Sequence, residues 1–334
     1  MVNNNNLILL VLTLFYCISS ATLSFINNYG EAIHTNYTNT CNIPNALQMS
    51  NAETVKVKIE TFDGSDFTII WDDTTSVKVN SLEEICHTYD LPYSGKVRFE
   101  ELNGMQVKSI EISGGFAFDI QQLYGFAPKI ESIISNENIQ CYGDVASKPT
   151  SLIYIDLQIG NFCGHFNKDR LRNVKRLRIV DGNTVSFDIA DFDNTINYIG
   201  VTGMNTATGL LDSLNYPSLH HFDVKGMNSI SGDLGNINTP LLSVFYLGGN
   251  NTSSSYSAGN LNISSNPQIF IYAGLLNTLS TADIDALLID LDNVSTTWSG
   301  ARLLILTGAH STPSDNSLTA RSNLEMKGAN VFTN

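Results

Sequence analysis

Apolar and polar residues alternate in a pattern that recurs along the middle of the chain. In PSLHHFDVKGMN, residues 217–228, one apolar residue is followed by two more, three and five positions on, and by asparagine nine positions on. The second and third apolar residues flank a polar one, which is the period-two alternation of a strand with one buried face. The segment is therefore predicted to be a short strand followed by a turn.

This pattern occurs five times in strict register. Successive copies start 22, 22, 23 and 23 residues apart. Weaker copies begin at Val107 and Ile130, and Ile269 with Tyr272 begins a degenerate one. Because one copy cannot bury its own apolar face, we expect the copies to stack as a parallel sheet over a shared core. The five quartets are Leu152/Ile155/Leu157/Asn161, Val174/Leu177/Ile179/Asn183, Ile196/Ile199/Val201/Asn205, Leu219/Phe222/Val224/Asn228 and Leu242/Phe245/Leu247/Asn251.

The quartets resemble the leucine-rich repeat, L-x-x-L-x-L-x-x-N with a period of 20–29 residues. The resemblance covers about residues 105–280 and implies a solenoid with a parallel sheet. It also implies a ladder of asparagines whose side-chain amides satisfy backbone groups of the turns. The ladder positions are Asn161, Asn183, Asn205, Asn228 and Asn251.

The segments that flank the repeats have other periodicities. Residues 52–102 alternate in short runs between polar turns, which predicts an antiparallel β-sandwich. After Leu279, apolar residues at helical spacing follow an N-cap at Ser280 or Thr281, and a strand, a second helix and a last strand complete the chain. This tail is similar to the C-terminal ends of bacterial and phage surface repeat proteins, and we expect it to cover the exposed end of the solenoid.

The N-terminal strands carry a second, shorter resemblance. Their sequence is similar to the signature of the PKD-like extracellular sandwich, although an aspartate replaces the usual glycine. In such modules the tryptophan and tyrosine are core residues, and the histidine is a structural hydrogen-bonding group. The matching residues, in order, are Trp71, Asp72, Asp73, Thr74, His87, Tyr89 and Gly95.

The predicted fold is mainly β with some α, in four parts: a signal peptide (1–21), an N-terminal PKD-like sandwich (22–104), a leucine-rich-repeat solenoid (105–280) and a C-terminal cap (281–334). The signal peptide is inferred from an apolar run, Leu7 to Cys17, that precedes small residues ending at Ala21. This run is shorter than the about 20 residues of a membrane-spanning helix. We therefore expect a secreted, extracellular protein without a stable membrane span.

Charge and cysteine content indicate which partners and which disulfides to expect. A net charge of −14 offers no counterion release to a phosphate backbone, so a nucleic-acid partner is not expected. Four cysteines remain after signal cleavage, and an oxidising compartment favours two disulfides, with three pairings open. Cys141 and Cys163 each lie eleven residues after a repeat start. Adjacent strands would bring them within bonding reach, so we predict Cys141–Cys163 and, by elimination, Cys41–Cys86.

The exposed side of the predicted sheet carries the candidate binding residues, two and four positions after each repeat start. Their aromatic and cationic groups suit stacking on sugars or anchoring of a protein partner. The alternative is that exposed strand positions favour tyrosine for its β propensity alone. The residues are Tyr154, Asp156, Arg176, Arg178, Tyr198, His221, Asp223 and Tyr246.

No catalytic or cofactor motif is present: the sequence lacks H-E-x-x-H, G-x-S-x-G, P-loop and C-x-x-C patterns. His220 and His221 are neighbours on a strand and point to opposite faces, so they cannot hold one metal together. Calcium binding remains a possible function, because carboxylates, which calcium prefers as ligands, cluster in two segments. Neither segment has the D-x-D-x-D-G pattern of a calcium-binding loop. These carboxylates are Asp188, Asp191 and Asp193, and separately Asp72 and Asp73.

The sequence thus predicts a secreted, non-enzymatic glycoprotein that binds a protein or glycan partner of a cell surface or matrix, in adhesion or recognition, through the concave repeat sheet. The alternative is a structural subunit that self-assembles end to end into an extracellular filament, coat or matrix. A hydrolase is a third hypothesis, since spacing alone excludes no carboxylate pair and singles out none.

Glycosylation is expected at Asn36, Asn250, Asn262 and Asn293, each of which begins an acceptor sequon. Asn250 and Asn251 begin overlapping sequons in NNTS, and Asn251 holds a ladder position that should be inside. We therefore predict the glycan on Asn250. Mass-spectrometric mapping of glycopeptides checks this, and occupancy of Asn251 would shift the repeat register by one residue.

Overall fold

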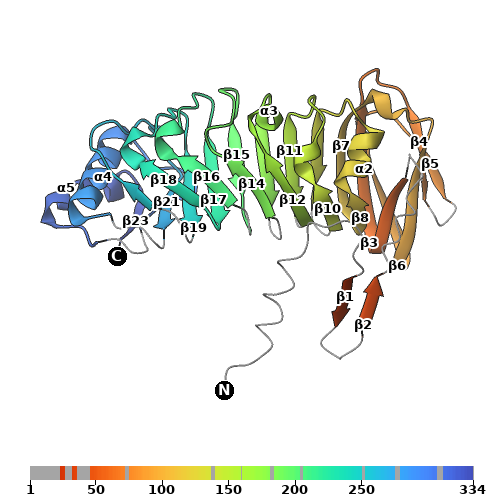
Figure 1. Ribbon diagram of the computed structural model, residues 1–334, viewed down its shortest axis with the longest axis horizontal. Coiled ribbons are helices and arrows are strands. Elements are labelled where there is room, and N and C mark those ends of the chain that lie inside the picture. The colour runs from red at the N-terminus through yellow and green to blue at the C-terminus, as the bar shows by residue number, and fades with distance from the viewer. Residues whose placement is uncertain are drawn as a thin grey trace. The chain divides into compact units, whose positions relative to one another are not determined.

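The computed structural model (Figure 1) describes residues 23–26, 32–35, 46–71, 75–136, 140–158, 160–180, 184–203, 206–249, 253–274, 279–306 and 311–333. The chain divides into two compact units, residues 1–44 and 45–334. In the first unit, β1 (Leu23–Ile26) and β2 (Ala32–Thr35) form an antiparallel pair. The predicted signal cleavage site lies outside the described residues.

The second unit contains the predicted parallel sheet, here called the first sheet. Ile155, Leu177, Ile199 and Phe222 pair in register on successive strands and are fully buried. Stacked rings continue the column, with centroids of Phe245 and Phe270 4.8 Å apart. The strands, in order of pairing, are β7 (Val107–Gly114), β9 (Ser132–Ser135), β11 (Tyr154–Gln158), β13 (Arg176–Val180), β15 (Tyr198–Val201), β17 (His221–Gly226), β19 (Val244–Gly249), β21 (Ile269–Gly274), β22 (Leu303–Leu306) and β23 (Asn330–Thr333).

A second parallel sheet, which the sequence pattern did not predict, follows the turns of the first. Each early repeat therefore forms a rung with one strand in each sheet, and phenylalanines such as Phe162 and Phe187 fill the core. Its strands are β8 (Phe116–Asp119), β10 (Gln140–Asp144), β12 (Gly160–Phe166), β14 (Thr184–Asp188), β16 (Thr206–Leu210), β18 (Ser229–Asp233) and β20 (Ser253–Ser255). Short helices follow some of these strands: α2 (Ile120–Phe126), η3 (Val145–Ser147), α3 (Lys168–Leu171), η4 (Leu211–Ser213) and η5 (Leu234–Asn236). Another, η2 (Gly104–Gln106), precedes β7.

Aspartates and glycines fix the spacing of the rungs where second-sheet strands end. Asp188 Oδ1 accepts a hydrogen bond of 2.8 Å from the Ala190 backbone N–H. Gly209, in the next rung, has a φ of 118°, and a Cβ there would lie 2.5 Å from the same oxygen. Asp144 and Gly164 repeat this arrangement. The aspartate of one rung thus occupies the space that only glycine leaves in the next.

The N-terminal strands are hydrogen-bonded to the solenoid and belong to the same compact unit. β3 (Ala46–Thr61) pairs antiparallel with β7 through its second half and with β8 through Gln48 and Met49. The pairing of β3 with β6 is irregular between Met49 and Thr54, and such irregularities let a strand bend. The sheet is completed by β4 (Phe67–Trp71), β5 (Ser76–Val79) and β6 (Glu84–Glu100). Backbone pairing therefore crosses the boundary expected at residue 104, inside one compact unit.

The aromatic residues of the PKD-like resemblance pack together inside this region. The Trp71 and His87 rings stack with centroids 4.5 Å apart, and the His87 and Tyr89 centroids are 4.6 Å apart. Trp71 and Tyr89 are buried. Asp72, Asp73 and Thr74 lie outside the described residues.

The C-terminal tail has the expected order of elements. Its members are α4 (Thr281–Val294), β22, η6 (Asp315–Ser317), α5 (Leu318–Met326) and β23, and Ser280 forms a capping box with Asp283. β22 and β23 lengthen the first sheet, while α4 and α5 replace second-sheet strands in the connections. The tail therefore continues the rungs and leaves β23 as their last strand (Figure 1). None of the described helices is long and apolar enough to span a membrane.

Two buried aspartates of α4 form hydrogen bonds with neighbouring segments. Asp285 accepts hydrogen bonds from the Ser314 N–H at 2.9 Å and the Ser317 hydroxyl at 2.6 Å. Burial alone would raise the pKa of Asp285, but these hydrogen bonds together outweigh burial and hold the pKa below its usual value. Asp290 accepts from the Tyr256 hydroxyl at 2.6 Å.

Two predicted registers were wrong because turn lengths vary. Phe245 pairs with Phe270 and Leu247 with Tyr272, so Ile269 faces outward and the degenerate repeat begins two residues earlier than predicted. Cys141 pairs with Gly160, which places Cys163 three residues, or about 10 Å, further along the neighbouring strand. That separation exceeds the about 7 Å limit between disulfide-bonded Cα atoms. The Cys141–Cys163 bridge is therefore excluded. Cys86 is exposed. The Cys41–Cys86 pairing stays a prediction, because Cys41 lies outside the described residues.

The close packing of glycine on aspartate predicts opposite effects for two Gly-to-Ala substitutions. Gly209→Ala should destabilise the fold by about 3 kcal/mol, because it adds backbone strain and a clash with Asp188. Gly125→Ala is the control, since Gly125 lies in α2 with open space around its Cα, and alanine there should stabilise by about 0.5 kcal/mol. Urea unfolding of both variants measures the difference; equal effects would contradict the stacking.

Candidate functional site

The outward side of the first sheet, here called the first-sheet face, brings together all eight predicted binding residues. The parallel register aligns them in two rows, one residue from each strand. Row one contains Tyr154, Arg176, Tyr198, His221, Val244, Ile269 and Leu303; row two contains Asp156, Arg178, Gly200, Asp223, Tyr246, Ile271, Ile305 and Phe332.

Charged and aromatic side chains in the middle of this face form one continuous ladder. Asp156 accepts from Arg176 Nη2 at 2.9 Å and, through its other oxygen, from Arg178 Nη1 at 2.9 Å. The Arg176 guanidinium carbon lies 3.9 Å from the centroid of the Tyr198 ring. That ring stacks on His221 with centroids 4.0 Å apart and planes 8° apart. Asp156, Arg176, Tyr198 and His221 therefore hold each other in place, and we call them the stacked ladder.

The orientation of the Tyr198 ring limits what this residue can bind. Tyr198 has Arg176 against one side and His221 against the other, so its edge faces solvent. Lys225 Nζ lies 4.0 Å from the centroid of the Tyr246 ring and covers it in turn. Gly200 permits the upright ring, because a Cβ there would lie 2.7 Å from Tyr198 Cε1. The Tyr198 ring therefore offers no free side on which a sugar could stack.

Partial burial shifts the pKa of two residues of the stacked ladder, His221 and Tyr198, and of the nearby Asp223. Burial, with a contribution from Arg176, lowers the pKa of His221 to about 4, so this ring is neutral at pH 7. Burial also raises the pKa of Asp223, although Lys225 lies 3.1 Å away. In the same way, burial raises the pKa of the Tyr198 hydroxyl.

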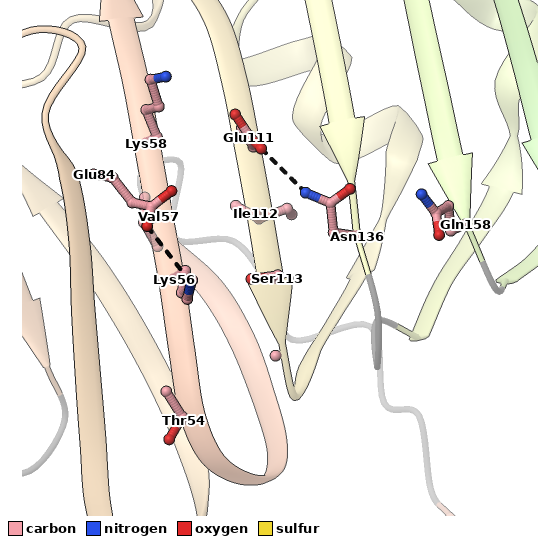
Figure 2. A pocket seen from close by; sticks show the side chains of 11 residues that line it. Thr54, Lys56, Val57, Lys58, Glu84, Glu111, Ile112, Ser113, Asn136 and Gln158 are labelled. Atoms are coloured by element: carbon pink, nitrogen blue, oxygen red, sulfur yellow. Dashed lines mark hydrogen bonds and ion pairs between the residues drawn. The ribbon is translucent and has the colours of Figure 1, made fainter.

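A polar pocket of about 440 Å³ marks the N-terminal end of the first-sheet face (Figure 2). It lies where β3 meets β7, beside the C-terminal ends of β9 and β11. Lys56 and Glu84 are 3.5 Å apart on its wall, and Asn136 Nδ2 donates to Glu111 Oε1 at 3.1 Å. Figure 2 shows Gln158 beyond Asn136 along the same side. Sequence reasoning missed this pocket because it depends on the pairing of β3 with β7.

The opposite end of the face is apolar. Val244, Ile269 and Leu303 continue row one, and Ile271 and Ile305 continue row two. This apolar strip ends at Phe332, which is 53% exposed. The sequence pattern predicted a degenerate repeat at IFIYAG and a strand that contains LLIL, but it assigned no outward residues in either segment.

The remaining predicted sites fall elsewhere. The Asp188 carboxylate accepts a hydrogen bond from the Ala190 N–H, and that of Asp193 accepts one from the Asn173 N–H at 3.0 Å. Within the described part of the chain, no cluster of three or more His, Cys, Asp or Glu could hold a metal ion, and Asp188, Asp191 and Asp193 form none. His220 is exposed just before β17.

Asn228 is the predicted ladder position whose side chain is described. It is fully buried and donates to the Gly248 carbonyl of the next rung at 2.8 Å. The Asn161 side chain and Asn183, Asn205 and Asn251 are outside the described residues. A second asparagine row, which the sequence pattern did not assign, joins Asn262 to Asn238 at 2.7 Å and Asn238 to Asn215 at 2.8 Å. The sequon residues Asn262 and Asn293 are exposed, and Asn36 and Asn250 are outside the described residues.

No protein-family model and no curated protein matches the chain. Among solved structures it is similar to a plant ice-binding protein, with 17% identity over 50% of this chain and 62% of that one and a TM-score of 0.35. It is also similar to the plant peptide hormone receptor RGFR1 in complex with RGF2, with 19% identity over 65% of this chain, 38% of that one and a TM-score of 0.40. The chain spans less than two thirds of either protein.

The lowered pKa of His221 predicts a loss of stability in mild acid. Free histidine has a pKa near 6.5, so between pH 6.5 and about 4 the unfolded chain binds a proton at this position that the folded chain resists. The free energy of unfolding should therefore fall as pH drops through this range. Urea unfolding at several pH values measures the slope, and His221→Phe should make it shallower. An unchanged slope would show that His221 protonates freely in the folded protein.

Proposed function

We propose that this protein is an extracellular recognition protein of the leucine-rich-repeat type that binds a polypeptide through the first-sheet face. The observation that carries the proposal is the juxtaposition of the stacked ladder with the apolar strip. Protein interfaces combine an apolar core with polar groups at its rim, and aromatic and arginine residues contribute most of the binding energy.

The stacked ladder favours high affinity because its side chains are already ordered. Arg176 and Arg178 share the two carboxylate oxygens of Asp156, and Tyr198 lies between Arg176 and His221. Immobilising a flexible side chain on binding costs about 0.5–1.5 kcal/mol, and contacts formed before binding avoid that cost. The remaining donors of the two guanidinium groups suit a carboxylate or carbonyl group of the partner.

A polypeptide fits this face better than a glycan for two reasons. Sugar recognition by aromatic residues needs a free ring side, and both sides of Tyr198 are covered. The apolar strip from Val244 to Phe332 suits aliphatic or aromatic side chains, which a peptide carries and most sugars lack. The role proposed is binding without catalysis, since Asp156 and Asp223 are both engaged by basic side chains.

The test is selection from a phage-displayed random peptide library on the immobilised full chain. Enriched peptides are expected to carry apolar residues and an acidic group. Tyr246→Ala and Ile305→Ala should each weaken binding of a selected peptide about tenfold, as expected at a hot spot. Leu210→Ala is the matched control, because Leu210 is an exposed apolar residue of the second sheet, and it should leave the affinity unchanged.

A glycan array probed with the same variants separates the two partner classes. Binding to a glycan that Tyr246→Ala abolishes would replace the polypeptide proposal with a sugar-binding one. Selected peptides whose affinity responds to Leu210→Ala, and not to Ile305→Ala, would place the binding surface on the second sheet.

A further inference from the structure

The two ends of the second unit differ in how their outermost strands are paired. At the N-terminal end, β3 pairs antiparallel with β7 and β8, so the first rung has a neighbour in both sheets. At the other end, β23 pairs with β22 alone among the described strands. The Asn330 N–H donates to the Arg302 carbonyl at 2.7 Å, so by alternation the N–H groups of Val331 and Thr333 point to the opposite edge.

Among the described residues, this edge carries none of the features that prevent strands from pairing with other molecules. Natural edge strands are protected by charges, prolines, bulges or a covering element. β23 has the sequence NVFT, which contains neither charge nor proline. Beside it, α5 buries Ala320 and Leu324, while Leu318 is 54% and Met326 78% exposed. Figure 1 shows α5 beyond α4, at the end of the row of rungs.

Two ion pairs lie at this end, although the whole chain has a net charge of −14. Arg321 and Glu325 lie 3.6 Å apart on α5, and Lys327 pairs with Asp292 at 2.6 Å. Strong like charge would oppose contact between identical surfaces. Each of these two pairs is neutral, so neither adds net like charge to a contact between two copies of this end.

We propose that two copies of the chain associate through this end, with β23 of one copy pairing antiparallel with β23 of the other. Antiparallel pairing about a two-fold axis is self-complementary, because each strand gives the other the same backbone groups. It also repeats the way in which β3 covers β7 within the chain. Leu318, Met326 and Phe332 would lose exposed apolar area in this contact.

The geometry of this pair has a consequence for binding. A two-fold axis perpendicular to the sheet leaves both first-sheet faces on the same side, with the two apolar strips meeting at the centre. The pair would present the face twice, so a ligand with two binding segments would gain affinity from simultaneous contact. The association itself rests on the end rung alone and does not require that the first-sheet face binds a peptide.

Sedimentation velocity of the full chain over a range of concentrations tests the association. The wild-type protein is expected to form a reversible dimer. Met326→Lys combined with Phe332→Lys places like charges around the two-fold axis and should raise the dimer Kd at least tenfold. The matched control is Leu241→Lys, at a residue that is 56% exposed in a turn of the central rungs, and the dimer Kd should be unchanged. A monomer at every concentration overturns the proposal, as does a dimer that the double variant leaves intact.

Hydrogen exchange distinguishes strand pairing from another contact at the same end. The amides of Val331 and Thr333 should exchange at least tenfold more slowly in the concentrated dimer than in the dilute monomer. A dimer in which these two amides exchange at the monomer rate would refute pairing through β23.

Discussion

Parallel register between successive rungs is the constraint on which the rest of this structure depends. Strands about 4.8 Å apart place the same position of every repeat above its predecessor. Inside, this brings the rings of Phe222, Phe245 and Phe270 into stacks. Outside, the same spacing brings Arg176, Tyr198 and His221 close enough to stack as well. The same register therefore determines both the packing of the core and the arrangement of the candidate site.

That register repeats only while each rung leaves room for the next, and small residues secure this room. The Asp188 carboxylate packs beside the Cα of Gly209, and the Asp144 carboxylate packs beside the Cα of Gly164. The carboxylates in turn hold the backbone that begins the following turn. Tyr198 and Gly200 show the same dependence on the first-sheet face, since only glycine leaves space for the upright ring. Absence of a side chain is thus as important to the site as the side chains that line it.

The sequence pattern predicted burial well and connectivity poorly. Apolar positions such as Ile155 and Phe222 were predicted to face the core, and the polar positions between them to face outward, because alternation reports directly on sidedness. Turn length leaves no periodic signal, so the offset that separates Cys141 from Cys163 was invisible. The N-terminal runs predicted strands, but alternation does not identify a strand's partner, and a sandwich was expected where β3 joins the solenoid.

The same limit explains why sequence analysis placed these residues on one face but did not predict how their side chains contact one another. Sequence position placed Tyr198 and His221 on one face, and from there either sugar stacking or protein binding could follow. Whether the Tyr198 ring has a free side depends on its orientation, which the neighbouring strands determine. With Arg176 and His221 against its two sides, Tyr198 contributes rigidity to its neighbours and an edge to solvent. In the proposed binding of a polypeptide, the fixed guanidinium groups and the apolar strip would then supply most of the binding energy.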